Sequence, residues 1–227
     1  YDWNLPDGFP IPLVPEDNPM SDEKVELGRL LFYDIRLSDN QTQSCGSCHL
    51  QELAFTDGLA NGVGSTEEVH PRSSMGLTNI AYASVLTWGN PLQRNLEEQM
   101  LGPFFGDMPI ELGMKSQEEL VARVEADPDY LLRFDDVFGA GEEGSLVDLD
   151  RITKAIAAFE RTLNSANSSY DRYIYAAEED ALSAAQKRGM DLFFSERFDC
   201  FHCHGGFNFS DSVQHDGTVF EEIRFHN

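Results

Sequence analysis

All four cysteines of the chain lie in two copies of one five-residue pattern, Cys-x-x-Cys-His. The pattern reads CGSCH from Cys45 and CFHCH from Cys200. Thiols at this spacing can form a four-sulfur zinc site, a pair of thioredoxin-like redox sites or a disulfide framework. None of these alternatives explains the histidine that directly follows each pair, in a chain with only six histidines. The full pattern is typical of covalent attachment of c-type haem.

Haem attachment gives every residue of the pattern a chemical task. The two thiols add across the two vinyl groups of one porphyrin, and the imidazole that follows them ligates the iron. The sequence therefore predicts two covalently bound c-type haems. The expected thioether anchors are Cys45 and Cys48 for the first haem and Cys200 and Cys203 for the second, with His49 and His204 as the proximal iron ligands. Covalent haem also predicts the periplasm or an equivalent compartment, where c-type cytochromes mature.

A second repeated pattern precedes both motifs and identifies the elements that must position them. Gly-x-x-Leu-Phe occupies residues 28–32 and again 189–193. The first copy lies in a helix expected to begin near Ser21, and the second in a helix expected over residues 181–194. A glycine one turn before a Leu-Phe pair allows another helix to approach closely. The chain therefore resembles two copies of one unit, each a helix followed by a haem attachment motif.

The remaining periodicity is helical, and we find no convincing run of alternating strands. Further helices are expected over residues 117–126, 130–138 and 150–163. The small polar stretch at residues 164–170, NSANSSY, is typical of an inter-domain linker. We therefore predict an all-α protein of two domains, residues 1–165 and 166–227.

Composition excludes several classes of partner. The chain has 227 residues, 41% of them hydrophobic, and a formal net charge of -24. Such an acidic surface repels nucleic acid and anionic lipid, and it either serves solubility alone or attracts basic partners. No segment approaches the roughly 18 to 20 apolar residues that a membrane span requires. We expect neither a nucleic-acid partner nor a membrane partner.

The segment between the motifs, residues 87–114, contains three further residues that can do chemistry. Trp88 lies among turn residues, Gln99 lies in the helix-like stretch NLEEQM, and Glu111 lies in a turn with apolar neighbours. Taken singly, each has an ordinary interpretation: a core indole, an amide on a solvated helix face and a surface charge. Only their combination and order indicate a site.

That order resembles the bacterial di-haem cytochrome c peroxidase superfamily over nearly the whole chain. The matching segments, in order, are ELGRLLFYDIRLS, SCGSCH, GLTNIAY, the tryptophan, LEEQMLGP, PIELG, CFHCH and RFHN. The resemblance implies two cytochrome c-like domains, each with one covalent haem. It also implies that the N-terminal haem reacts with peroxide and that the C-terminal haem relays electrons to it.

Several further residues take roles by this resemblance. Glu111 would be the acid-base group that moves a proton between the two peroxide oxygens, which suits a carboxylate in a partly apolar pocket. Gln99 would orient peroxide and water, and Pro103 would line the pocket. Trp88 would lie between the haems as an electron-hopping station. Asn79 resembles a family ligand to a calcium ion held between the domains.

The chain departs from the plain peroxidase pattern at the tryptophan. Family members of that type commonly carry Trp-Asp-Gly-Arg, whereas Trp88 continues as Gly-Asn-Pro. Together with the segment EEQMLGPFFGDMPIELG, this variant is closer to the MbnH-like branch, relatives of MauG that oxidise tryptophans in a partner protein.

His70 is a further candidate iron ligand, because it could match the distal histidine of the first haem in some resting peroxidases. The alternative interpretation is that His70 is an ordinary loop histidine exposed to water.

Three functions follow as hypotheses. The first is a periplasmic di-haem oxidoreductase that reduces hydrogen peroxide to water, with a small electron-donor protein, a c-type cytochrome or a cupredoxin, as its partner. The second is a MauG-like or MbnH-like enzyme that oxidises tryptophan or tyrosine residues of a protein substrate. The third is a non-catalytic di-haem electron carrier. A homodimer is the candidate assembly.

The sequence also predicts that the second domain is incomplete in this chain. Only twenty-three residues follow His204, whereas a cytochrome c-like domain takes its distal ligand from residues well after the motif. We expect His202 to be held at the porphyrin edge by the two cysteines and Met190 to lie on the helix side that packs under the ring, so neither reaches the far face of that haem. His215 and His226 lie in a polar stretch without a helical pattern. By family resemblance, a methionine or tyrosine beyond Asn227 would be the distal ligand, leaving one haem face uncovered here.

Overall fold

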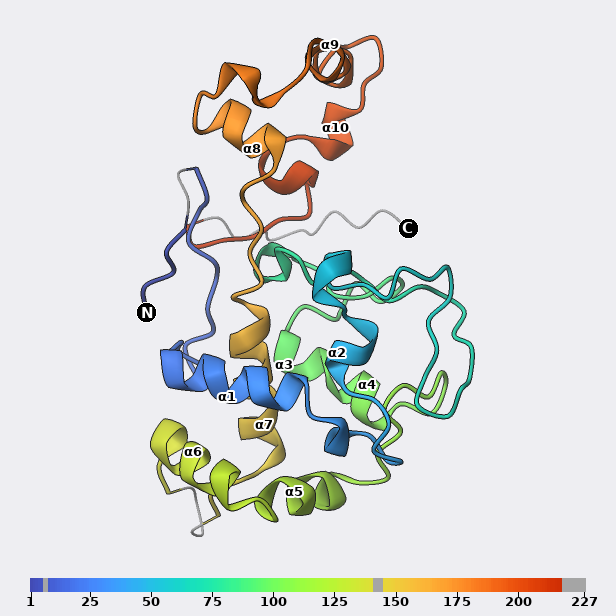
Figure 1. The fold of residues 1–227 in the computed structure, drawn as a ribbon, viewed down its shortest axis with the longest axis vertical. Coiled ribbons are helices and arrows are strands. Elements are labelled where there is room, and N and C mark those ends of the chain that lie inside the picture. The colour runs from blue at the N-terminus through green and yellow to red at the C-terminus, as the bar shows by residue number, and fades with distance from the viewer. Residues whose placement is uncertain (6–7, 141–144, 218–227) are drawn as a thin grey trace.

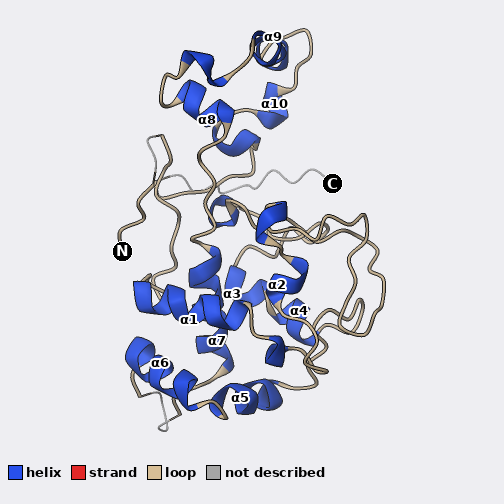
Figure 2. Ribbon diagram, in the orientation of Figure 1, coloured by secondary structure: helices blue, strands red, loops and turns tan. Residues whose placement is uncertain are grey.

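The computed structural model describes residues 1–5, 8–140 and 145–217, and the regular secondary structure of this part of the chain is helical. Figure 2 shows helices joined by loops and turns, and the pairing of extended backbone is limited to three isolated bridges within the described residues. The α-helices are α1 (Asp22–Phe32), α2 (Cys45–Cys48), α3 (Leu96–Gln99), α4 (Leu101–Phe105), α5 (Gln117–Glu125), α6 (Pro128–Phe138), α7 (Leu149–Glu160), α8 (Ser169–Ile174), α9 (Ala184–Phe193) and α10 (Phe201–His204). Short 3-10 turns lie at Ile35–Leu37, Gln51–Leu53, Ile80–Tyr82, Glu179–Ala181 and Phe207–Phe209. The all-α prediction is confirmed for the described residues.

Each of the four longest helices of the first unit begins directly after a capping side chain. The Ser21 hydroxyl accepts a hydrogen bond from the Lys24 N–H at 3.1 Å, which starts α1 one residue later. Side chains of Ser116, Asp127 and Asp148 cap α5, α6 and α7 in the same way. Such caps satisfy N–H groups that have no partner within the helix. The predicted helices are present, with α6 beginning two residues earlier and α7 ending three residues earlier than expected.

Helix α7 is the centre of the first unit, and α1 packs across it (Figure 1). The contact depends on Gly28, where a Cβ would lie 1.9 Å from the backbone oxygen of Ala155. Only a glycine allows the two backbones to approach this closely. Around the crossing, α7 is buried on nearly all sides from Ala155 onward, and Leu27, Leu31 and Phe32 of α1 are fully buried. The close approach predicted for the first Gly-x-x-Leu-Phe pattern is confirmed.

The second unit, α8 to α10, lies at one end of the molecule, at the top of Figure 1. Among its described residues, Leu182 and Val213 are the buried apolar side chains. Large apolar groups of the same unit are exposed, including Leu192, Phe198 and Phe209. This unit therefore has very little core of its own in the described part of the chain.

The two units are joined by a small aromatic cluster and by polar contacts. Phe9, from the extended N-terminal segment, packs edge to face against Tyr82 and Phe207. The Ser84 hydroxyl donates to the Ser212 carbonyl at 2.9 Å. The N-terminal segment therefore bridges the units, although no sequence pattern predicted a role for it. No helix among the described residues is both long enough and apolar enough to cross a membrane.

Candidate functional site

The first Cys-x-x-Cys-His motif forms the single turn of α2. The His49 N–H donates to the Cys45 carbonyl at 3.0 Å, and the Ser44 N–H donates to the Ser47 hydroxyl at 3.0 Å. Residues three apart on a helix share one face, so the turn presents Cys45 and Cys48 together. Both cysteines line the same cavity as His49.

The His49 imidazole is oriented by a backbone carbonyl. Its Nδ1 lies 2.8 Å from the carbonyl oxygen of Phe55. This carbonyl is aimed by Ala54 and Phe55, both of which have left-handed backbone angles (φ 58° and 59°). Burial lowers the pKa of His49, although the carbonyls of Phe55 and Met75 oppose the shift. A neutral imidazole that donates from Nδ1 presents the lone pair of Nε2, the arrangement usual for a histidine that ligates a metal.

A cavity of about 290 Å³ brings most of the predicted site residues together. The predicted residues that line it are Cys45, Cys48, His49, His70, Trp88, Gln99, Pro103 and Glu111. Its walls are otherwise largely apolar, with Leu77, Ile80, Leu86, Leu96, Met100 and Phe104 among them. An apolar cavity with two thiols and an imidazole on one wall has the donor set and the lining that a c-type haem requires. The residues present therefore fit the group.

Glu111 lies in a loop whose backbone is held by three consecutive carbonyls. The Ile110 carbonyl oxygen lies 2.9 Å from Nε2 of His70, and the Glu111 carbonyl accepts from the Ser65 N–H at 2.8 Å. The Leu112 carbonyl accepts from the Asp39 N–H at 2.9 Å and from the Ser65 hydroxyl at 3.2 Å. Burial raises the pKa of Glu111, and the charge of His70 partly opposes it. Glu111 is thus a carboxyl in the cavity whose affinity for a proton is increased.

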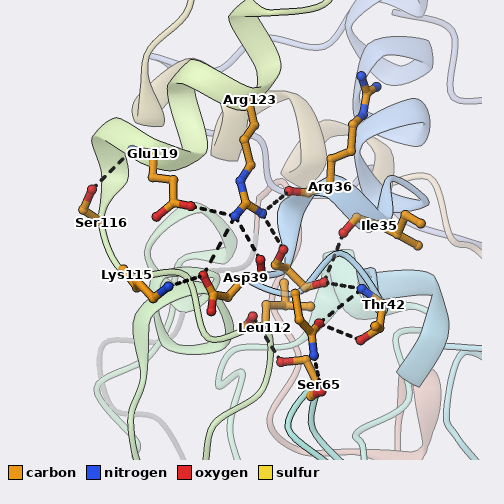
Figure 3. A network of polar contacts seen from close by, with 12 residues as sticks. Ile35, Arg36, Asp39, Thr42, Ser65, Leu112, Lys115, Ser116, Glu119 and Arg123 are labelled. Carbon is orange, nitrogen blue, oxygen red and sulfur yellow. Dashed lines mark hydrogen bonds and ion pairs between the residues drawn. The ribbon is translucent and has the colours of Figure 1, made fainter.

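The neighbouring loop is held by Arg123 of α5, a residue that the sequence did not single out (Figure 3). Its guanidinium donates to the carbonyls of Arg36, Ser38 and Asp39 at 3.0, 2.6 and 2.9 Å, and it also pairs with Glu119 at 2.7 Å. Because the Asp39 N–H binds the Glu111 loop, Arg123 supports the position of that loop. No local pattern signals this role, since the accepting carbonyls lie more than eighty residues away in the sequence.

Gln99 and Pro103 reach the cavity from the short helices α3 and α4. Helix α3 is held by Glu97, which forms a two-pronged ion pair with Arg161 at 2.8 and 3.0 Å. Trp88 lines the cavity and is 45% exposed, and its indole N–H donates to the Ser73 carbonyl at 3.0 Å. The interpretation of Trp88 as a core residue is wrong, because almost half of the residue is exposed.

Asn79 is buried at the junction of the two units. Its side-chain amide donates to the Ser165 carbonyl at 3.2 Å and to the Asn208 side chain at 3.1 Å, and its oxygen accepts from the Ser165 N–H at 2.8 Å. Asn79 therefore contacts residues on both sides of the unit boundary, and its role as a calcium ligand stays a prediction.

The second motif has the same local geometry but a different environment. Nδ1 of His204 lies 3.2 Å from the carbonyl of Phe209, and the two residues Asn208 and Phe209 again have left-handed backbone angles. Cys203 and His204 are exposed, however, whereas their counterparts in the first motif are half-buried. Among the other histidines near this motif, His202 contacts the Asp199 carboxylate. Nδ1 of His215 lies 2.9 Å from the Asp216 carbonyl, and His226 falls outside the described residues.

Comparison with known proteins identifies the family of the chain. A family model described as di-haem cytochrome c peroxidase matches residues 22–180. The chain is 35% identical over 202 residues to the methylamine utilization protein MauG of Methylorubrum extorquens, covering 89% of this chain and 55% of that protein. It is 34% identical over 197 residues to the cytochrome c peroxidase Ccp of Escherichia coli, covering 87% and 40%.

A solved structure extends the similarity to the whole chain. The crystal structure of a MauG-like protein associated with microbial copper homeostasis matches with a TM-score of 0.92 and 45% identity, covering 100% of this chain and 64% of that one. The chain spans about half the length of the curated relatives it matches. Because the family model covers most of the chain and the attachment residues of the first motif line one cavity, the chain belongs to the di-haem cytochrome c peroxidase family.

Proposed function

We propose that this chain carries the peroxide-reacting site of a periplasmic di-haem oxidoreductase that reduces hydrogen peroxide to water. Electrons would enter from a small donor protein, a c-type cytochrome or a cupredoxin, and pass through a second haem bound by Cys200, Cys203 and His204. The observation that carries the proposal is the cavity that places Glu111 and Gln99 with the attachment residues of the first motif. Covalent haem supports the periplasmic location.

Each residue of the cavity has a defined task in this proposal. When bound through Cys45, Cys48 and His49, the haem supplies the electrons and the iron that cleave the peroxide O–O bond. Each peroxide consumes two electrons and two protons and yields two waters. Glu111 takes a proton from the near peroxide oxygen and returns it to the departing one, a task helped by a carboxyl pKa raised by burial. Gln99 hydrogen-bonds peroxide through its amide.

Trp88 and Asn79 have proposed roles at the boundary with the second unit. The partly exposed Trp88 lines the cavity, where it can carry an electron between the haems. The buried amide of Asn79 contacts residues on both sides of the unit boundary, so a calcium ion at its Oδ1 would stiffen that boundary. Pro103 limits the volume available over the first haem.

The variant Glu111→Gln tests the acid-base role in the haem-loaded protein. We expect peroxide turnover to fall by about a hundredfold or more, the usual loss when a general acid-base group is removed. Stopped-flow measurement of peroxide consumption with a reduced donor checks this, and haem content should stay at the parent value. Glu125→Gln, an exposed change of the same chemistry on α5, should leave turnover unchanged. Parent-level turnover in Glu111→Gln would assign Glu111 to the structural support of its loop.

A second candidate function is supported by the match to the MauG-like protein associated with microbial copper homeostasis. In that case the electrons would come from tryptophan or tyrosine side chains of a partner protein. The two candidates differ in which molecule reduces the enzyme after it has reacted with peroxide. Rapid turnover with a small reduced cytochrome supports the first, whereas slow turnover accompanied by oxidised tryptophan in a co-expressed partner supports the second. A protein that does not consume peroxide at all is an electron carrier.

A further inference from the structure

One buried carboxyl of the cavity has no place in the proposed peroxide chemistry. Glu160, the last residue of α7, is only 6% exposed and lines the cavity that contains Cys45 and Glu111. No hydrogen bond to its carboxylate is formed by the residues that the structure describes. A buried carboxyl without a donor is costly as an anion, so such a group holds a proton or faces a ligand that can bind it.

The adjacent positive charge does not neutralise Glu160. The Arg161 guanidinium gives its hydrogen bonds to Glu97, at 2.8 and 3.0 Å. From α1, the buried Lys24 ammonium donates to the Asn18 side chain and the Pro19 carbonyl. The buried cations from the helices that pack around α7 therefore have other partners, and Glu160 faces the cavity instead.

The two carboxyls beside Arg161 consequently differ in their affinity for protons. Burial raises the pKa of Glu160 to about 8; the charge of Arg161 opposes this rise, and that of Glu97 adds to it. Burial alone would also raise the pKa of Glu97, but the hydrogen bonds and charge of Arg161 lower it overall. Of the two carboxyls, Glu160 therefore has the higher affinity for a proton.

The charges of Glu160 and Glu111 both affect the attachment site, but they do not affect each other. The charge of Glu160 affects the Cys45 thiol, whereas the charge of Glu111 affects both Cys45 and Cys48. Neither carboxyl is among the groups that shift the pKa of the other. Glu160 is thus a distinct protonatable group at the Cys45 end of the cavity.

We propose that Glu160 is the redox-linked protonation site of the first haem: it keeps its proton while that haem is reduced and releases it to water when one electron leaves. Loss of the electron adds one positive charge to a cavity of low dielectric, and loss of the Glu160 proton leaves a carboxylate that balances it. One electron and one proton depart together, so the net charge of the cavity is conserved. This inference rests on haem attachment, and it does not depend on the peroxide reaction.

The test is the midpoint potential of the first haem as a function of pH, measured by spectroelectrochemistry on the haem-loaded protein without peroxide. We expect the parent potential to fall as pH rises between roughly 6 and 9, because high pH favours the deprotonated, oxidised form. Glu160→Gln should remove this slope and keep the potential at the parent's low-pH value at every pH. A slope that persists unchanged in Glu160→Gln overturns the proposal, as does a parent potential that does not vary with pH.

Two comparison variants assign the slope to one carboxyl. Glu111→Gln and the exposed change Glu125→Gln should both keep the parent slope, which separates Glu160 from the other cavity carboxyl and from net charge. If Glu160→Gln does not bind haem, Glu160→Asp and the parent are examined by infrared difference spectroscopy. A protonated-carboxyl band that is lost on oxidation of the parent, and that shifts in Glu160→Asp, supports the proposal. The absence of that band, or a band unmoved by the substitution, contradicts it.

Discussion

The two attachment motifs have nearly the same local geometry and very different surroundings. The ring centroids of Phe32 and His49 are 6.4 Å apart, and those of Phe193 and His204 are 6.5 Å apart. In both units Nδ1 of the histidine faces a carbonyl that follows within six residues. The helix, the motif and the turn after it therefore form one repeated unit whose geometry does not need a core.

What differs is the packing around the repeat. In the first unit Phe32 is fully buried and α7 lies against Gly28, whereas in the second unit Phe193 is only half-buried. A Cβ on Gly189 would meet nothing within 4 Å among the described residues. The local turn is thus specified by local residues, while the enclosed cavity requires a helix from elsewhere in the chain.

The largest expected effect comes from removing the thiols of each motif in turn. Cys45→Ala with Cys48→Ala, or Cys200→Ala with Cys203→Ala, should each halve the haem that stays on the chain in denaturing electrophoresis. Before denaturation the first variant should still hold extractable haem, because the cavity and His49 remain. The second variant should lose the haem of the second motif even before denaturation, because Cys203 and His204 are exposed. If both variants retained the same amount of haem before denaturation, the contrast between the buried first motif and the exposed second motif would be contradicted.

A pair of glycine substitutions tests the packing difference directly. Gly28→Ala places a Cβ 1.9 Å from a backbone oxygen of α7 and should destabilise the protein by about 1–3 kcal/mol, the usual cost of overpacking. Gly189→Ala has open space and should stabilise helix α9 by about 0.5–1 kcal/mol. Urea unfolding followed by circular dichroism measures both. A destabilising Gly189→Ala would mean that this helix already packs against another part of the protein.

A smaller effect is expected from the loop support that only the first unit has. Arg123→Lys loses the planar group that reaches three carbonyls at once and should lower the free energy of unfolding by about 0.5–1.5 kcal/mol. Peroxide turnover should fall less than in Glu111→Gln, because the Glu111 loop retains its other contacts. Arg197→Lys in the second unit replaces an exposed side chain and should change stability by less than about 0.5 kcal/mol. Equal losses in thermal unfolding would argue against a specific role for Arg123.

The sequence alone indicated the family and much of the local structure. Spacing within Cys45 to His49 and its repeat specified the attachment turns, because a single helical turn brings residues three apart to one face. Ser21 predicted where the first long helix begins, since such side chains satisfy N–H groups that have no helical partner. The order of motifs identified the family and proposed Gln99 and Glu111 as residues of the first haem site.

Only the tertiary structure decided which of these residues share a cavity and what surrounds them. Arg123 and Glu160 gave no signal in the sequence, because their roles depend on carbonyls and cavity walls contributed by distant segments. The same holds for the burial that raises the pKa of Glu111. The contrast between Gly28 and Gly189 was equally hidden, since two copies of one pattern differ only in whether another helix packs against them. Local backbone preferences act over a few residues, whereas burial is a property of the whole packed chain.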